Sequence, residues 1–388
     1  MDIGDMSDLR KFVAPEIVFG AGARCLAGRY AKNFGARKVL VVTDPGIIAA
    51  GWTGQVTEGF EDEGLDYAVF SDITPNPRAE QVTAGVEIYR IENCHAIVAV
   101  GGGSVMDCAK GIGIAGSNRQ NVLDFEGVDR VSTPGPPLIC IPTTAGTSAD
   151  VSQFAIITDG RRKIKIAVIS KTVVPDVALI DPVTTTSMDA YLTACTGLDA
   201  LTHAIEAYAS NAHSHFTDLH ALEAIRLVAA NLVPAIADPD NIELRNRMTL
   251  GSMYAGLAFS NASLGAVHAM AHSLGGLLDL AHGECNAILL SHVVSFNFDT
   301  IPERYGHIGQ AMGLDIHDMS PDARKAAILF ELNRLRTNAG VNRTLGQIGV
   351  SKRDIPELAE NAMQDPCMVT NPRVPDRRDI EGIYEKAL

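Results

Sequence analysis

Short apolar runs rich in β-branched residues alternate with longer amphipathic stretches through the first half of the chain, and then stop. These runs lie at 38–42, 66–70, 96–100, 137–144, 163–170 and 176–181. Strand–helix–strand alternation of this length predicts a mostly parallel sheet with helices on both faces. After about Thr186 helical periodicity dominates. With 388 residues, we predict two domains: an α/β dinucleotide-binding domain over 1–184 and an all-helical, metal-binding domain over 185–388, with the boundary within 182–188.

Composition argues against several classes of partner. The formal net charge of −14 disfavours nucleic acid and an anionic membrane surface. The longest apolar runs fall far short of the ~20 residues that span a bilayer, and the first twelve residues lack the apolar core of a signal peptide. The seven cysteines contain no CxxC pair, which is typical of reduced thiols. We expect a cytoplasmic protein with a small neutral substrate and no membrane partner.

A glycine run at 101–103 lies where an apolar strand is expected to end and a helix to begin. Consecutive glycines let the backbone approach a ligand, and a new helix directs unpaired N–H groups toward it. We expect Ser104 to cap a helix that runs from Val105, with Asp107 completing a capping box. The pattern favours a pyrophosphate site, and an ordinary tight turn between strand and helix is the alternative.

Two other strand ends carry candidate cofactor groups. Asp44 follows the apolar run at 38–42. A carboxylate at the end of such a strand can bind ribose hydroxyls and would repel a 2′-phosphate. The alternative is that Asp44 caps a helix or lies in a turn. The segment 143–148 offers four hydroxyls and a glycine, which suit hydrogen bonding to a cofactor. An ordinary polar turn is the alternative. The usual dinucleotide fingerprint is absent, because Gly20 and Gly22 are followed by Cys25 instead of a third small residue.

Histidines are concentrated in the second half, where eight of the eleven fall between 203 and 292. Asp199 and His203 are four residues apart on an expected helix, as are His268 and His272, so each pair shares one helix face. His282 follows in an expected glycine-flanked turn. One carboxylate with three or four imidazoles suits Fe²⁺ or Zn²⁺. A solvated or hydrogen-bonded histidine is the alternative for each residue taken singly.

Other polar residues near this set are expected to lie outside it. Glu206 follows His203 by three residues and is expected to support the helix surface or the surroundings of the ligands. His213 and His215 fall in a polar stretch typical of an exposed loop, so we predict that they are not ligands.

Nine motifs run in order along most of the chain, and together they resemble the iron-containing (group III) alcohol dehydrogenases. No single motif is decisive, but their order and spacing are specific. The motifs are FGAG, VVTDPG, GGGSVMDCAKGI, IPTTAGTSAD, VALIDP, TGLDALTHAIEAY, GAVHAMAHSLGG, HGECNAILLSHV and NPR.

The resemblance implies a nucleotide-binding α/β domain, a helical domain and an active site in the cleft between them. It implies that the metal ligands are Asp199, His203, His268 and His282, and that His272 lies near the nicotinamide and substrate. Asp44 matches a position associated with NAD over NADP. The implied cofactor-binding residues are Gly101, Gly102, Gly103, Ser104, Asp107, Thr143, Thr144, Thr147, Lys165 and Leu179.

The implied activity is the NAD-dependent interconversion of primary alcohols and aldehydes, with iron as the metal, zinc as the alternative, and a homodimer as the assembly. Two rivals remain: a zinc enzyme similar to glycerol dehydrogenase or dehydroquinate synthase, and a member of the alcohol-dehydrogenase-like regulatory branch. The chain departs from the family at Cys285, where an alanine usually precedes the asparagine of HGxxN.

Overall fold

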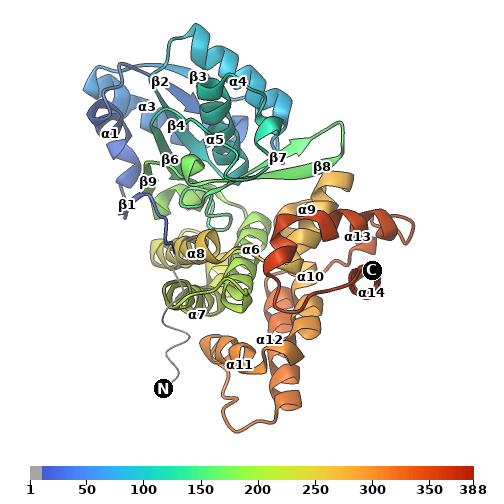
Figure 1. Ribbon diagram of the computed structural model, residues 1–388. Coiled ribbons are helices and arrows are strands. Elements are labelled where there is room, and N and C mark those ends of the chain that lie inside the picture. Colours follow the sequence, from blue (N-terminus) through green and yellow to red (C-terminus); the bar gives the residue numbers. More distant parts are fainter. Residues whose placement is uncertain (1–10) are drawn as a thin grey trace.

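The computed structural model describes residues 11–388. The expectation that the first twelve residues form no signal peptide concerns a segment that lies almost entirely outside the described residues. The first half is an α/β unit and the second is helical, with the β7–β8 hairpin reaching from one to the other beside α9 (Figure 1). The predicted fold class, an α/β half followed by a helical half, is confirmed.

Six parallel strands form the main sheet, in the order β1-β9-β6-β4-β2-β3. The central strand β4 is buried along its whole length, as expected for a parallel strand covered on both faces. Gly101 at its end is in register with Pro142 of β6, so the two following loops lie side by side. The strands are β1 (Glu16–Phe19), β2 (Lys38–Val42), β3 (Asp66–Phe70), β4 (Ala96–Gly101), β6 (Leu138–Pro142) and β9 (Val177–Ile180).

Helices cover both faces of this sheet. Successive side chains of a strand point to opposite faces: Leu40 and Val42 pack with α4 and α5, whereas Val39 and Val41 pack with α1 and α3. The apolar runs are therefore continuous rather than alternating. The helices of this half are α1 (Ala27–Asn33), α2 (Pro45–Ala49), α3 (Trp52–Glu63), α4 (Ala79–Ile91) and α5 (Gly103–Asn118).

A small second sheet lies outside the predicted, mostly parallel sheet. The run at 163–170 forms β8, which pairs antiparallel with an unpredicted strand, β7, in a hairpin. Lys163, at φ 55°, lies in the tight turn that joins them. The strands are β5 (Gly127–Val128), β7 (Phe154–Asp159) and β8 (Ile164–Ile169).

The second half has no strand after β9 within the described residues. Side-chain caps start several of its helices, among them Asp189 before α6, Ser214 before α7 and Asn241 before α8. These helices are α6 (Ala190–Ala209), α7 (His215–Ala237), α8 (Ile242–Ala262), α9 (Ala266–Leu278), α10 (His282–Asn297), α11 (Pro302–Ala311), α12 (Pro321–Asn338), α13 (Ile355–Gln364) and α14 (Arg377–Ala387). Short 3₁₀ helices are η2 (Ala23–Leu26), η3 (Val122–Phe125), η4 (Lys171–Val173), η5 (Pro182–Ser187), η6 (Phe298–Thr300), η7 (Gly346–Ile348) and η8 (Pro366–Thr370).

One helix of the described chain, α7, is long and apolar enough to cross a membrane by length and composition alone. It packs against α6 and α8, and a core helix of a helical domain passes the same test. All seven cysteines are free.

Candidate active site between the two halves

A cavity between the α/β half and the helical half collects most of the predicted site residues. From the first half they are Gly103, Ser104, Asp107, Thr147 and Lys165. From the second half they are Asp199, His203, His268, His272 and His282.

The buried carboxylate of Asp199 lies at the centre of the histidine cluster. Its Oδ1 is 3.6 Å from His268 Nε2 and 3.8 Å from His282 Nε2. Donor atoms of these three residues all lie within 4.8 Å of one another. His203 is one helical turn beyond Asp199, with its Nδ1 3.9 Å from Oδ2 and its ring stacked on His268 at 4.4 Å. Three of the four predicted ligands thus converge closely, and the fourth flanks them.

The expected glycine-flanked turn at His282 is wrong, because Gly275 and Gly276 lie inside α9 and His282 is the first residue of α10. The glycines are needed for packing. A Cβ at Gly276 would lie 2.7 Å from the Ile164 backbone of β8. This close approach of helix to hairpin carries Lys165 into the cavity.

Electrostatics of the cluster favour an ionised Asp199 carboxylate beside neutral imidazoles at His203 and His282. Burial alone would raise the pKa of Asp199, but the His203 and His282 rings hold it well below its ordinary value. Burial lowers the pKa of His203 to about 3 and that of His282 well below its usual range. Burial opposes protonation of His268, yet contacts with Asp199 and Glu206 raise its pKa to about 9.

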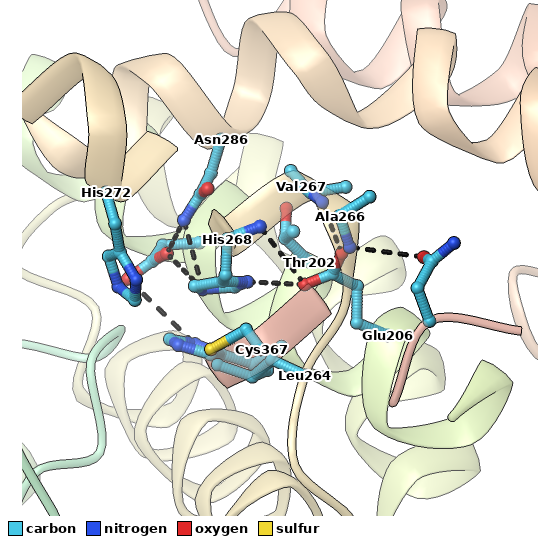
Figure 2. Close-up of polar contacts among 12 residues, drawn as sticks. Thr202, Glu206, Leu264, Ala266, Val267, His268, His272, Asn286 and Cys367 are labelled. Carbon is cyan, nitrogen blue, oxygen red and sulfur yellow. Dashed lines mark hydrogen bonds and ion pairs between the residues drawn. The ribbon is translucent and has the colours of Figure 1, made fainter. Parts of the chain in front are cut away.

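Asn286 was not singled out from the sequence, although it completes the HGxxN motif. Its Nδ2 is 3.1 Å from His268 Nε2 (Figure 2). The same atom is 2.7 Å from Asp199 Oδ1 and 3.2 Å from His282 Nε2. Three nitrogen and oxygen atoms therefore converge on one NH₂ group, which has only two hydrogens to donate. The buried Nδ1 of His203 and Nδ1 of His282 have no hydrogen-bond partner among the described residues. Converging lone pairs from nitrogen and oxygen donors fit a divalent metal of the Fe²⁺ or Zn²⁺ type.

Glu206 lies behind the cluster, as expected, and orients His268. Its Oε2 is 2.6 Å from His268 Nδ1, and its Oε1 accepts the Val267 N–H at 2.6 Å (Figure 2). A carboxylate on one ring nitrogen directs the other nitrogen toward a metal and raises its basicity. Glu206 thus fixes both the ring and the first turn of α9.

His272 lies one turn beyond His268 and contacts a different carboxylate. Its Nδ1 is 2.9 Å from Oδ2 of Asp365, and its ring stacks on His282 at 5.3 Å with 14° between the planes. Asp365 lies 93 residues along the chain from His272, and no sequence spacing relates the two.

The predicted cap of α5 is wrong. The helix begins at Gly103 with Gly102 as its N-cap and no side-chain cap, so Ser104 lies in the first turn and forms no capping box with Asp107. An uncapped first turn leaves backbone N–H groups without intrahelical partners. Asp107 faces the cavity, and burial raises its pKa to about 6.

The remaining predicted cofactor residues lie around this turn or farther away. Thr144 packs against Gly102, and Thr143 is buried with no hydrogen-bond partner for its Oγ1 among residues 11–388. Gly101 ends β4, and Leu179 is fully buried in β9. Asp44 N-caps α2 through a 3.0 Å contact of Oδ1 with the Ile47 N–H, which is the alternative expected for it; its second oxygen is not used in that cap.

Close packing at Gly103 gives a first testable prediction. A Cβ there would lie 2.7 Å from the Thr147 side chain, so Gly103→Ala is expected to displace the loop and weaken NADH binding about tenfold. Quenching or enhancement of NADH fluorescence measures the affinity. The control is Gly116→Ala in the same helix, where no atom lies within 4 Å of the added Cβ. Equal affinities in the two variants would contradict the assignment of this loop to the cofactor.

Sequence comparison with known protein families covers both halves of the chain. Residues 14–182 match the family model for iron-containing alcohol dehydrogenase, and residues 193–388 match the model for the C-terminal part of the Fe-containing alcohol dehydrogenase family.

Individual relatives match over nearly the whole length. The chain is 39% identical over 377 residues to the NAD-dependent methanol dehydrogenase of Bacillus methanolicus, covering 97% of this chain and 99% of the relative. It is 39% identical to the 1,3-propanediol dehydrogenase of Citrobacter freundii, with coverage of 97% and 98%. A solved 1,3-propanediol oxidoreductase superposes with a TM-score of 0.95 at 37% identity, covering 98% of this chain and 100% of that one.

Proposed function

This chain belongs to the iron-containing alcohol dehydrogenase family, and on that basis we propose that its buried carboxylate–histidine cluster holds the family's metal. The protein is an NAD-dependent alcohol dehydrogenase that interconverts alcohols and aldehydes. The proposed substrates are primary alcohols, and the proposed metal is iron, with zinc as the alternative. The proposed ligands are Asp199, His203, His268 and His282.

The observation that carries this proposal is the convergence of donor atoms on one buried point. Asp199, His268 and His282 come from three different helices, yet their donor atoms lie within 4.8 Å of one another. Gathering these groups in a protein interior costs free energy unless a cation or hydrogen bonds compensate. A metal bound there would supply Lewis acidity that lowers the pKa of an alcohol hydroxyl.

The chain's own residues would bind and orient the reactants. We propose that the first turn of α5 binds the cofactor pyrophosphate, as helix N-termini bind anions, and that Asp107 and Lys165 bind cofactor polar groups in the cavity. NAD⁺ supplies the hydride acceptor. His272, which lines the same cavity, is placed to accept the hydroxyl proton or to orient the nicotinamide.

Asp44 is proposed to select NAD over NADP by repelling a 2′-phosphate. Asp44→Asn removes the charge but keeps an N-cap acceptor for the Ile47 N–H. We expect kcat/KM with NADP⁺ to rise about tenfold relative to that with NAD⁺, because one charge repulsion is lost. Steady-state kinetics with both cofactors measure the ratio. If the ratio of the two kcat/KM values is unchanged from that of the parent protein, Asp44 caps the helix but does not select the cofactor.

Three further proposals rest on the family and on the sequence pattern. We propose a homodimer, a cytoplasmic location, and a division into a dinucleotide-binding domain (1–184) and a metal-binding domain (185–388). The matches to separate models over 14–182 and 193–388 support the division. Sedimentation equilibrium of the metal-loaded protein tests the dimer.

The proposed function is tested by NADH formation with a panel of C2–C6 alcohols and diols. The protein is purified anaerobically and its iron and zinc are quantified. We expect turnover of primary alcohols in proportion to bound iron. Bound zinc with a preference for glycerol would favour a glycerol dehydrogenase-like enzyme, and negligible turnover of the iron-loaded protein across the panel would favour a regulatory role.

A further inference from the structure

A second buried pair of titratable side chains lies beside the proposed metal ligands. His272 Nδ1 and Asp365 Oδ2 are 2.9 Å apart, and both side chains are less than a tenth exposed. The histidine is on α9 and lines the cavity, whereas the aspartate begins the 3₁₀ helix η8 near the end of the chain. The fold therefore joins two distant segments at one imidazole.

Asp365 is held in place from two sides. Its Oδ1 accepts the Cys367 N–H at 2.8 Å and N-caps η8, which leaves Oδ2 for His272. The segment after it is tied to the start of α9, because Thr370 Oγ1 donates to the Leu264 carbonyl at 2.6 Å and Asn371 Oδ1 accepts the Ala266 N–H at 3.1 Å. The carboxylate and the helix that carries His272 thus form one packed unit.

The geometry assigns different tasks to the two nitrogens of His272. Burial alone would raise the pKa of Asp365, but the adjacent His272 ring and the Cys367 N–H lower it, so its carboxylate is ionised and acts only as an acceptor. Nδ1 must then be the donor. The ring nitrogen left for the cavity is Nε2, and in a neutral imidazole it carries the lone pair.

We propose that Asp365 is a positioning residue for the alcohol dehydrogenase reaction, holding His272 with Nδ1–H on the carboxylate and the Nε2 lone pair toward the substrate. This inference rests on the proposed function. In the oxidation, the hydroxyl proton passes to Nε2 and the carbinol hydride passes to NAD⁺, which yields aldehyde, NADH and a protonated His272. The proton then leaves Nε2 for solvent, and Asp365 stays ionised, as in other histidine–aspartate pairs.

A second metal site at these residues is the alternative to a hydrogen-bonded pair, and the experiment must distinguish the two. Donor atoms of His272, Asp365 and Cys367 lie within 4.8 Å of one another, as in a metal site. His272 Nδ1 and Asp365 Oδ2 lie at the 2.9 Å distance of a hydrogen bond, and Asp365 Oδ1 already accepts the Cys367 N–H. The hydrogen-bonded pair is therefore favoured over a second metal.

Asp365→Asn is the informative variant, because one amide offers only one acceptor for two donors. If the amide oxygen keeps the Cys367 N–H, the NH₂ group faces Nδ1 of His272 and favours the tautomer with the proton on Nε2. We expect kcat to fall about 100-fold or more, with KM for the alcohol and Kd for NAD⁺ changed less than about threefold. Asp365→Glu is expected to recover part of kcat. The control is Asp354→Asn, which alters a carboxylate that accepts hydrogen bonds from Ser351 at the surface.

A spectroscopic readout separates this inference from the proposed function. In zinc-loaded protein labelled with ¹⁵N-histidine, we expect His272 to carry its proton on Nδ1, and to carry it on Nε2 in Asp365→Asn. A parent protein inactive toward every alcohol would overturn the proposed function while leaving this NMR assignment testable. The positioning role is overturned by unchanged tautomers, by an unchanged kcat, or by a second equivalent of metal per chain that Asp365→Asn abolishes.

Discussion

Replacing Asp199 with alanine is expected to release the metal and abolish alcohol oxidation. An oxygen of Asp199 lies within 4 Å of both His268 and His282, so the loss of this side chain removes both a proposed ligand and the negative charge that would offset the cation. We expect metal content to fall below a tenth of an equivalent and kcat/KM to fall on the order of 10³-fold or more. Metal analysis by mass spectrometry and NADH formation measure the two quantities.

The control for this variant is Asp62→Ala, which removes an exposed carboxylate from α3. It should keep full metal content and activity. Normal iron content and turnover in Asp199→Ala would show that the metal, where bound, lies elsewhere.

The second large effect is expected at Glu206, which lies behind His268. Glu206→Ala leaves His268 Nδ1 and the Val267 N–H without the carboxylate that each contacts at 2.6 Å. We expect metal affinity to fall about 10–100-fold and the free energy of unfolding to fall by about 3 kcal/mol, because buried polar groups lose their partner. Competition with a chelator and urea denaturation measure these changes.

Glu243→Ala serves as its control, since this exposed glutamate forms only a surface ion pair with Arg247. Such pairs contribute about 0–1 kcal/mol. Unchanged metal affinity in Glu206→Ala would mean that Glu206 supports the helix start but not the ligand. A Glu206→Gln variant that keeps stability but loses affinity would separate the two roles.

Sequence spacing predicted those parts of the site that depend on local helical geometry. Asp199 with His203, and His268 with His272, share helix faces because residues four apart always do. Spacing alone did not distinguish His268 from His272; the resemblance made that distinction. In the structure the two differ in their partners, since His268 contacts Glu206 and His272 contacts Asp365.

Residues that reach the site from distant segments could not be predicted from local sequence spacing. Asp365 reaches His272 only because η8 packs on α9, and the signal for Asn286 was present in the HGxxN motif but was not used. The β7–β8 hairpin was missed for a related reason. A short apolar run has the same sequence pattern in a parallel and in an antiparallel sheet, and the direction of pairing depends on the partner strand. The start of α5 was misplaced because Ser104 has a side chain typical of caps, whereas close packing of Gly102 on Thr144 and Gly103 on Thr147 set the turn.

Anomalous diffraction from crystals of the anaerobically iron-loaded protein, measured on both sides of the iron edge, locates the metal directly. We expect one iron peak per chain, within coordination distance of donor atoms of all four proposed ligands, with Asn286 Nδ2 turned away from the position it occupies here. The proposed ligands in that map are Asp199, His203, His268 and His282. An iron peak bound by other residues, or no peak in protein that oxidises alcohols at full rate, would show that these four residues do not form the catalytic metal site.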